Sequence, residues 1–354
     1  MNRAFEINVV GRPVGPGRPA LLVAEIGGNH GGDAGLAGRM VEAAAGAGAD
    51  AVKFQAYRTH DFLSRLNPYY DELAAEELPF ADLAFLVGLA HEKGLGAGLT
   101  VFDEAGLRLA EECGADFLKI SSGDLTNHPL LAKVATVRKP LFISTGAADE
   151  GEVRAALAAC GPAENRLVVM QCTALYPAPP EAANLAVPAR WLDEGLAAGY
   201  SDHVAGLEAA DAALSLGAVV LEKHFTVDQS LPGGDNSISA LPADLAKLRG
   251  RISGAAPGRG ATARPPAGIS PVLWGSGDKR PHPLEMPMRP IIRRAVLAAV
   301  NLQAGRVLGR EDLALRRPPA AGDFLGPQEY EMLPGRTLKH DMPEGAPLSW
   351  ADLA

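Results

Sequence analysis

The sequence has few cysteines, no long apolar run and no excess of positive charge. Its three cysteines, Cys113, Cys160 and Cys172, follow no metal-binding or disulfide spacing, which suits a reducing cytoplasm. No apolar run approaches the roughly 20 residues that a membrane-spanning helix needs, and the first ten residues do not resemble a signal peptide. The net charge of −9 over 354 residues argues against nucleic acid as a partner. We therefore expect a cytoplasmic protein that binds neither membranes nor nucleic acid.

What the sequence does contain is one pattern that occurs three times. In each copy a helical stretch ends in a glycine turn and is followed by a short apolar strand. The fifth residue after the glycine is Lys53, Lys119 or Glu222, and in the third copy the seventh is His224. Fifth and seventh residues share one face of a strand because side chains alternate. The three copies are 47–55, 113–121 and 216–225.

Strand-like runs alternate with helical patterns from the N-terminus to about residue 253. Eight such units over about 250 residues are typical of a (β/α)8 TIM barrel. A doubly wound open sheet is the main rival, but no GxGxxG motif follows the first strand. The expected strands are 21–26, 51–55, 95–100, 116–121, 140–144, 167–172, 198–201 and 219–225.

The composition divides the chain into three parts. Residues 1–255 form the expected barrel, and residues 256–288 are rich in proline and glycine and lack helical periodicity, which indicates a linker. Short β-like runs separated by turns predict a small β-rich domain at 289–354. A hydrophobic core of this size gives only marginal stability on its own, so we expect the small domain to pack against another part of the protein or another subunit.

Two lysines lie inside apolar strands, where lysine is seldom found without a partner. Lys53 and Lys119 lie at equivalent strand ends, where a barrel enzyme carries its active site. Together they suggest a site for phosphate or carboxylate. Glu222 shares their face and can pair with either lysine, so a purely structural network is the alternative. By parity Lys223 points the other way.

Further polar residues end other strands. Glu25 ends the first strand within an apolar run, where an unpaired carboxylate is costly; it is either a functional carboxylate or half of a structural ion pair. His203 and His224 end the last two strands, which are neighbours in the proposed barrel. Two such histidines can share one divalent metal and leave positions open for water and substrate. A structural role for each histidine is the alternative.

Taken together, these segments resemble the sialic acid synthase family over nearly the whole chain. AEIGGNHGGD resembles the family's opening motif, and RRPPAAGDFLGPQEYEMLPGR resembles the closing stretch of its antifreeze-like (SAF) domain. Between them come, in the family's order, GADAVKFQ, KISSGDLTNHPLL, ISTG, QCTALYP, GYSDH, EKHF and PGGD.

The resemblance implies a reaction and a set of roles. Members of the family condense phosphoenolpyruvate with N-acetylmannosamine or a related N-acyl hexosamine, in a site to which the partner subunit of a domain-swapped homodimer lends a SAF arginine. By resemblance, phosphoenolpyruvate is held by Lys53, Lys119, Ser122, Ser144 and Ser201; Mn²⁺ or Mg²⁺ is bound by His203 and His224; Glu25 and Asp124 are the acid/base carboxylates; and the sugar is contacted by Thr100, Tyr176, Asp235 and, from the partner, Arg317.

Three positions depart from the family pattern. Ala174 replaces the usual Ser or Asn, so one contact to phosphoenolpyruvate is either missing or supplied by backbone. GGDN at 233–236 replaces GPDH beside Asp235, and the loop after Arg317 is one residue longer. These departures bear mainly on which sugar is bound. The alternatives are another metal-dependent barrel aldolase, a 3-deoxy-sugar-acid synthase, or a non-catalytic carbohydrate-binding homologue.

Overall fold

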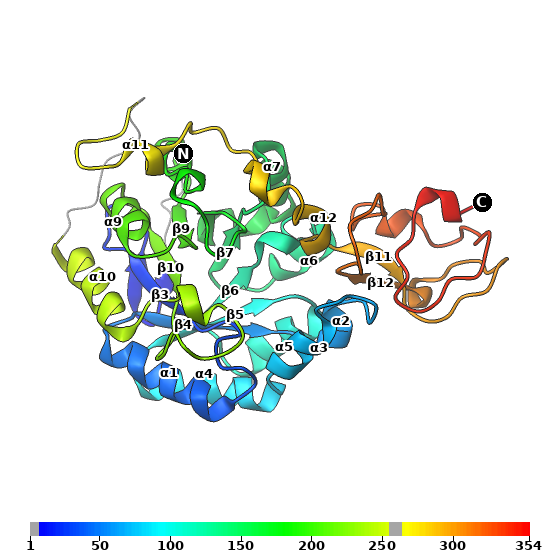
Figure 1. Cartoon of the computed structure of the whole chain (residues 1–354), viewed down its shortest axis with the longest axis horizontal. Helices are drawn as coiled ribbons and strands as arrows, with labels where there is room; N and C mark the ends of the chain where they lie inside the picture. Colours follow the sequence, from blue (N-terminus) through cyan, green and yellow to red (C-terminus); the bar gives the residue numbers. More distant parts are fainter. Residues whose placement is uncertain (1–6, 255–263) are drawn as a thin grey trace.

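Eight parallel strands close into a barrel in the computed structural model, which describes residues 7–254 and 264–354 (Figure 1). Around the barrel the strands follow chain order, and the last pairs with the first. This confirms the predicted TIM-barrel fold, and all eight predicted strands are present. They are β3 (Leu21–Glu25), β4 (Ala51–Ala56), β5 (Gly96–Val101), β6 (Phe117–Ile120), β7 (Leu141–Ser144), β8 (Leu167–Cys172), β9 (Ala198–Asp202) and β10 (Val220–His224).

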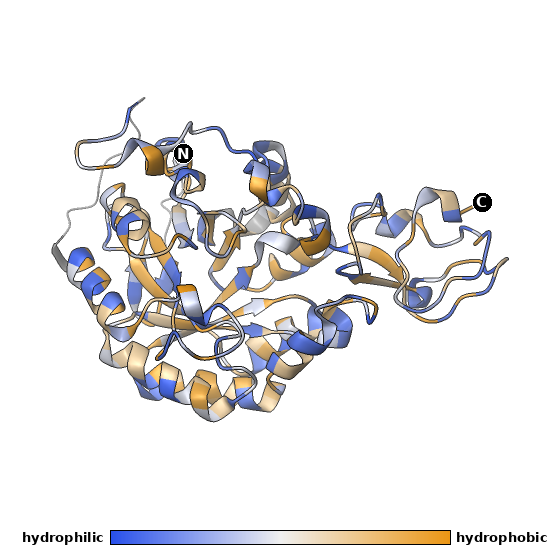
Figure 2. Cartoon of the chain, in the orientation of Figure 1, coloured by the Kyte–Doolittle hydropathy of each residue, from blue (hydrophilic) through white to orange (hydrophobic). Residues whose placement is uncertain are grey.

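A helix follows each strand and covers the outside of the barrel. Figure 2 shows hydrophobic residues along the barrel strands and hydrophilic ones on outer helices such as α10. Among the described residues, no helix has both the length and the apolar character needed to cross a membrane. The helices are α1 (Ala34–Gly46), α4 (Phe80–Glu92), α5 (Glu104–Glu112), α6 (His128–Val134), α7 (Glu150–Ala159), α8 (Ala186–Asp193), α9 (Glu208–Ser215) and α10 (Pro242–Gly254), with α2 (Thr59–Phe62) and α3 (Tyr70–Glu76) inserted before α4.

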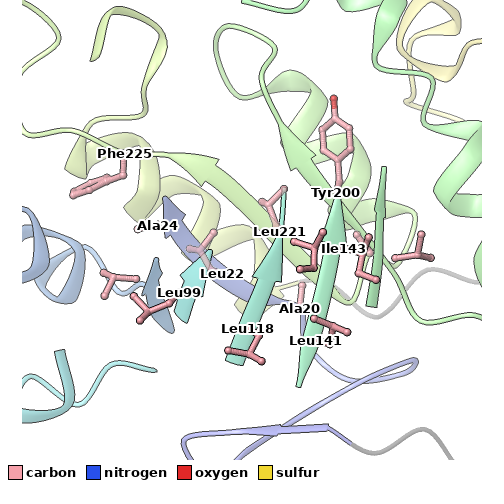
Figure 3. Close-up of a cluster of buried hydrophobic side chains, with 14 of the residues drawn as sticks. Ala20, Leu22, Ala24, Leu99, Leu118, Leu141, Ile143, Tyr200, Leu221 and Phe225 are labelled. Carbon is pink, nitrogen blue, oxygen red and sulfur yellow. The ribbon is translucent and has the colours of Figure 1, made fainter. Parts of the chain in front are cut away.

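The two faces of the strands carry different kinds of residue. Outward side chains such as Leu22, Leu118 and Leu221 are fully buried between strands and helices (Figure 3). Inward side chains near the amino ends of the strands, such as Phe117 and Phe142, fill the barrel interior. Polar residues take the inward positions only near the carboxyl ends. The alternation of faces along each strand therefore separates the core from a polar layer.

An N-terminal hairpin closes the amino end of the barrel. Strands β1 (Ile7–Val9) and β2 (Arg12–Val14) pair antiparallel, and their apolar residues join the interior cluster. Close packing here requires Gly98, because a Cβ at that position would lie 2.1 Å from the Phe117 ring. With this end closed, the carboxyl end is the accessible one.

The segment predicted as a linker is ordered and packs on the barrel. We call residues 264–292 the strap; the predicted positions 256–263 lie outside the described residues. The strap contains α11 (Pro271–Trp274), a turn at Pro283–Glu285 and α12 (Arg289–Ile292), and it runs over the barrel rim in Figure 1. Its Leu273 and Trp274 are buried in the main core. Proline and glycine here mark tight turns against a surface.

The chain ends in a small domain with its own hydrophobic core. Strands β11 (Ala295–Ala298) and β12 (Leu313–Arg316) pair antiparallel, and leucines from residues 302–353 pack around them. The domain contacts its own barrel: Arg317 N donates to Phe62 O at 2.9 Å, and Ser64 Oγ donates to Gly345 O at 2.7 Å. As the small core predicted, the domain is packed against a neighbour.

Candidate active site

Two buried lysines mark one side of the polar layer at the carboxyl ends of the strands. Lys53 on β4 and Lys119 on β6 are each 3% exposed. The ammonium group of Lys53 forms an ion pair with Glu25 and donates to Thr100 Oγ1 at 2.7 Å. Such ammonium groups can bind an anion without leaving the protein interior.

Glu222 lies between the two lysines. Its Oε1 accepts hydrogen bonds from Lys119 Nζ at 2.8 Å and from Ser201 Oγ at 2.9 Å, and its Oε2 lies 3.9 Å from Lys53 Nζ. Burial alone would raise the pKa of Glu222, but Lys119 and Lys53 hold it at about 2. The predicted pairing is confirmed, and the carboxylate stays charged at neutral pH.

Lys223 faces the opposite way, as parity predicted. Its Nζ donates to Asp202 Oδ2 at 2.7 Å and to Val204 O at 2.8 Å. Both Lys223 and Asp202 are buried outside the barrel interior, between β10 and β9. Glu222 and Lys223 are adjacent on β10 but point to opposite faces and form separate ion pairs.

Glu25 is the least satisfied carboxylate of the polar layer. It is 2% exposed, and burial raises its pKa although the neighbouring Lys53 opposes this. Glu25 Oε1 has no hydrogen-bond partner. It faces the turn at Gly27, where an added Cβ would lie 3.1 Å from Oε1 and 3.6 Å from His224 Cε1. A carboxyl group of raised pKa beside a histidine is suited to proton transfer.

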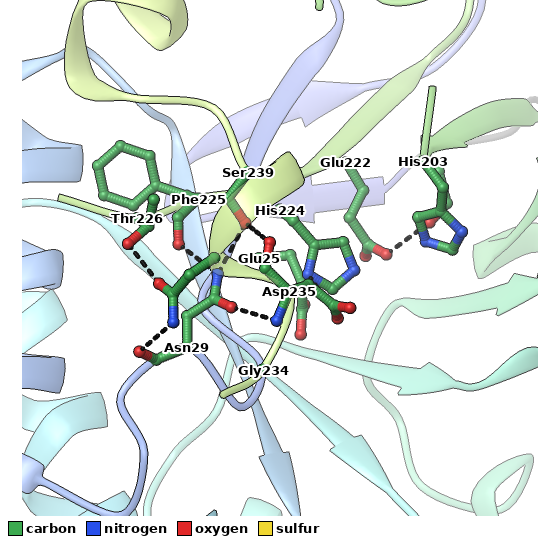
Figure 4. A network of polar contacts seen from close by, with 12 residues as sticks. Glu25, Asn29, His203, Glu222, His224, Phe225, Thr226, Gly234, Asp235 and Ser239 are labelled. Carbon is green, nitrogen blue, oxygen red and sulfur yellow. Dashed lines mark hydrogen bonds and ion pairs between the residues drawn. The ribbon is translucent and has the colours of Figure 1, made fainter. Parts of the chain in front are cut away.

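The two predicted metal ligands face each other. The ring centroids of His203 and His224 are 5.3 Å apart. In Figure 4, Asp235 lies beside His224 and Glu222 lies on the side of His203. His203 Nδ1 lies 2.6 Å from Thr173 O, a contact that leaves its other ring nitrogen for a ligand. His224 Nδ1 is buried without a hydrogen-bond partner, 3.4 Å from Asp235 Oδ2.

This donor set fits a divalent metal. Burial, and then the nearby His203, lower the pKa of His224 well below its usual range, so the ring is neutral. Burial also lowers the pKa of His203, but Cys172 and Thr173 outweigh it and raise it to about 9. Binding at His203 would therefore release a proton. Within residues 7–254 and 264–354, no group of three His, Cys, Asp or Glu side chains forms a metal site, so a metal bound here needs water or substrate as further ligands.

The three predicted serines differ in their availability. Ser144 Oγ is buried without any partner, which leaves it free for a ligand. Ser122 Oγ accepts from Gly146 N at 2.9 Å, and Ser201 is bound to Glu222. Thr100, predicted near the sugar, is held by Lys53. Only Ser144 therefore has its full hydrogen-bonding capacity available.

Asp124 has a partner that the sequence did not reveal. Its carboxylate is fully buried and accepts from Arg294 Nε at 2.8 Å, across 170 residues of sequence. It also accepts from Ser121 Oγ at 3.0 Å and Asn127 Nδ2 at 3.2 Å. Asp124 thus holds the beginning of the small domain against the loop after β6.

Arg317 extends from the small domain to the mouth of the barrel. Its guanidinium lies over the Phe62 ring, 4.3 Å from the centroid, and an added Cβ at Gly123 would lie 3.0 Å from its Nη2. Arg317 Nε is buried without a hydrogen-bond partner. Burial lowers the pKa of this arginine to about 10. Within this chain the arginine meets its own barrel, and the predicted contact to a partner subunit stays a prediction.

The sugar-side loop carries Gly234 where the family pattern has proline. Gly234 has a φ of +51°, which proline cannot adopt. Its N–H donates to Glu76 Oε1 at 2.9 Å, and the next N–H, of Asp235, donates to Asn29 Oδ1 at 2.8 Å. Asn236 is fixed within the loop by Thr226 Oγ1 at 2.6 Å. Glu76, Asn29 and Thr226 therefore brace the GGDN segment, and Asp235 lies against His224.

Tyr176 lies at the rim of the site. Its ring centroid is 4.1 Å from that of His203, and its side chain is half exposed. Sequence reasoning missed Glu76, Glu285 and Arg294, which brace the loops around the site. None of the three lies in a strand-end motif. The only sequence feature that could have pointed to them is a charged residue within a segment that packs on the barrel.

Known protein families and relatives share this arrangement of a barrel followed by a small domain. Residues 40–262 match the NeuB family and residues 293–354 match the SAF domain. The chain is 34% identical to N,N'-diacetyllegionaminic acid synthase of Legionella pneumophila over 96% of both chains. It is 32% identical to N-acetylneuraminate-9-phosphate synthase of Mus musculus, covering 86% of this chain and 85% of the relative.

A solved structure extends the match to three dimensions. Spore coat polysaccharide biosynthesis protein SpsE of Bacillus subtilis superposes with a TM-score of 0.83 at 29% identity, covering 99% of both chains. Both the barrel and the small domain are therefore shared with this protein. The chain belongs to the NeuB family.

Proposed function

We propose that this enzyme of the NeuB family condenses phosphoenolpyruvate with N-acetylmannosamine or a related N-acyl hexosamine. The products would be a sialic-acid-type nonulosonic acid and phosphate. The observation that carries the proposal is the meeting of two buried lysines and two facing histidines at one end of the barrel. The names of the Legionella and mouse relatives support a product of this class.

In this proposal the lysine side of the site receives phosphoenolpyruvate. Lys53 and Lys119 compensate its phosphate and carboxylate, and the unpartnered Ser144 hydroxyl donates to it. Ser122 and Ser201 shape this side through the bonds they already make. Because these groups are held in place before substrate arrives, they stabilise developing charge without reorganisation.

The proposed reaction forms one C–C bond and breaks one C–O bond. C3 of phosphoenolpyruvate attacks the aldehyde carbon of the open-chain sugar, and the aldehyde oxygen takes a proton and becomes a hydroxyl. Water adds at C2, and the resulting intermediate expels phosphate from the same carbon. We assign the proton transfer to Glu25: its carboxylate, paired with Lys53, accepts the proton that the attacking water loses, and the same proton is passed to the aldehyde oxygen. Burial raises the pKa of Glu25, which favours its brief protonation.

The histidine side of the site would hold Mn²⁺ or Mg²⁺ through His203 and His224. Such a metal supplies Lewis-acid polarisation of the aldehyde. Asp235 and Tyr176 lie against the two histidines, and we place the sugar beside them, with Thr100 and Arg317 on its other side. Because Arg294 holds the carboxylate of Asp124, we propose that Asp124 keeps the small domain at the mouth of the barrel in place of the acid/base role expected from the sequence.

We also propose that the enzyme is a homodimer that exchanges its small domains. Within one chain Arg317 already meets its own barrel, so exchange would place the same contacts between subunits. Arg317→Ala mixed with Lys119→Ala distinguishes the two arrangements. Exchange predicts partial recovery of activity from one intact site per mixed dimer. No recovery in demonstrated mixed dimers would assign each site to a single chain.

The reaction is tested by phosphate release from the purified protein. We expect release only when phosphoenolpyruvate, a suitable N-acyl hexosamine and Mn²⁺ are all present, with a nonulosonic acid detected by mass spectrometry. The acceptor panel should contain mono- and di-N-acyl hexosamines, each free and phosphorylated. Lys119→Ala is the inactive control. An absence of release across the panel would overturn the proposal.

A further inference from the structure

A carboxylate from the strap is buried behind the lysine side of the site. Glu285 is 3% exposed. Its Oε1 accepts from the backbone N–H groups of Ala147 at 2.8 Å and Ala174 at 2.6 Å, and its Oε2 accepts from His282 N at 2.7 Å. Three backbone donors on one buried carboxylate form a strong, charge-assisted contact.

The two alanines belong to the loops that follow β7 and β8. Gly146, just before Ala147, donates its N–H to Ser122 Oγ at 2.9 Å. A Cβ added at Gly146 would lie 3.0 Å from Ala174 Cβ, so the two loops touch. Ser144, with its unpartnered hydroxyl, ends β7 just before the first of these loops. Glu285 therefore joins two loops, and the first of them follows Ser144 directly and contacts Ser122 through Gly146 N.

The loop that Glu285 holds is conformationally strained. Ala147 has a φ of +52°, a left-handed conformation that costs a residue with a Cβ free energy. Besides Glu285, Arg293, the residue directly after the strap, braces Ala147 by donating from Nη2 to Ala147 O at 3.0 Å. A strained loop keeps its shape only while its surroundings enforce it. The strap thus supplies that constraint from outside the barrel.

We propose that Glu285 is a positioning residue for the phosphoenolpyruvate end of the site. It touches no substrate and acts through the Gly146–Ala147 and Ala174 backbone, which sets the placement of Ser122 and Ser144. The amide of Ala174, a residue whose side chain lacks the family's polar group, is then bound to Glu285 rather than free for substrate. The inference rests on the proposed function, because it assumes that phosphoenolpyruvate binds here.

The test compares Glu285→Gln with wild type. The amide keeps the size of the side chain but removes its charge and places an NH₂ against one of the three backbone donors, so the hydrogen bonds that hold the loops weaken. We expect the Kd for phosphoenolpyruvate, measured by calorimetry, and its KM to rise at least tenfold. The KM for the sugar and kcat should change less than twofold. A second variant, Ala147→Gly in the Glu285→Gln background, should recover much of the lost affinity because glycine adopts a positive φ without strain.

A matched control separates positioning from general destabilisation. Asp312 in the small domain is also 3% exposed and accepts from a backbone donor, Gly309 N at 2.8 Å. Asp312→Asn should lower the melting temperature without changing the affinity for phosphoenolpyruvate. If both variants weaken binding equally, or if Glu285→Gln binds as wild type does, the positioning role is wrong. If wild type itself does not bind phosphoenolpyruvate, the proposed function fails instead. Should Glu285→Gln not fold, Glu285→Asp carries the same comparison.

Discussion

Glu222 Oε1 accepts a hydrogen bond from Lys119 Nζ at 2.8 Å in the interior of the barrel. The second oxygen of Glu222 lies 3.9 Å from Lys53 Nζ, so one carboxylate serves both lysines. Burying two ammonium groups side by side would otherwise be costly. Glu222 therefore lets the site keep both positive charges ready for an anionic substrate.

Replacing Glu222 by Gln should damage both stability and substrate binding. The variant leaves Lys119 and Lys53 buried with only Glu25 to compensate them. Breaking a buried ion pair in this way typically costs about 3–5 kcal/mol of unfolding free energy. Urea unfolding should show that loss, and the KM for phosphoenolpyruvate should rise more than tenfold.

Asp202→Asn is the control for this variant. It breaks the buried pair with Lys223 on the other face of the same two strands. We expect a comparable loss of stability and an unchanged KM for phosphoenolpyruvate. Equal KM changes in the two variants would contradict a direct role for Glu222 in the site.

Removing one histidine should strongly weaken metal binding while the barrel remains folded. His203→Ala leaves His224 as a single imidazole ligand, which should weaken Mn²⁺ binding by more than the roughly 10–100-fold that loss of an indirect partner costs. Calorimetry with Mn²⁺ alone measures this independently of turnover. His30→Asn is the control, because His30 lies in the first loop and its Nδ1 accepts from Gly32 N at 3.0 Å. Wild-type Mn²⁺ affinity in His203→Ala would remove the metal role.

The barrel was predictable from sequence because its signals are local. Each strand is a short apolar run that follows a helix and a turn, and the inward or outward direction of its side chains follows from parity. That reasoning placed Lys53, Lys119 and Glu222 on one face and Lys223 on the other, as the structure has them. Contacts between side chains on neighbouring parallel strands can be predicted once the order of the strands in the barrel is known.

The bracing of the site was not predictable, because it comes from distant and irregular segments. Arg294 reaches Asp124 across 170 residues, and Glu285 reaches Ala147 from a segment that composition alone marks as a linker. Proline and glycine indicate turns equally well in a free linker and in one that packs on a surface. Only the burial of Leu273 and Trp274 distinguishes the two.

Gly234→Ala should disturb the sugar side of the site. Gly234 has a φ of +51°, and a Cβ there would lie 2.9 Å from backbone carbon of Gly28. Strain of this kind costs about 1–3 kcal/mol, and relief requires the loop that carries Asp235 to move. The KM for the sugar should rise several-fold while that for phosphoenolpyruvate stays constant.

Gly114→Ala controls for the backbone conformation alone. Gly114 has a φ of +74° with nothing within 4 Å of an added Cβ, and it precedes β6 at the amino end of the barrel. We expect a cost of about 1–2 kcal/mol from the left-handed conformation and no change in either KM. A sugar KM that shifts equally in both variants would show that the Gly234 loop does not set sugar affinity.

Lys279→Met should stabilise the protein at neutral pH. Lys279 is 6% exposed, and burial lowers its pKa from 10.5 to about 8, although Glu285 opposes the shift. Because the folded pKa lies below the unfolded one, the unfolded chain binds more protons between about pH 8 and 10.5. Below pH 8 the charged lysine therefore lowers the unfolding free energy by up to about 3 kcal/mol. This penalty disappears as the pH rises from about 8 to 10.5.

The difference in unfolding free energy between Lys279→Met and wild type measures this cost. This difference cancels the contributions that other groups titrating in the same range make to the unfolding free energy, provided that both proteins unfold in two states. We expect this difference to favour the variant at pH 7 and to shrink as the pH rises from about 8 to 10.5, because the folded lysine loses its proton first and the unfolded one is half deprotonated at pH 10.5. Lys247→Met, which removes a side chain that is 67% exposed, controls for loss of a surface charge. A difference that stays constant from pH 7 to 10.5 would show that the strap tolerates a charged Lys279 without cost.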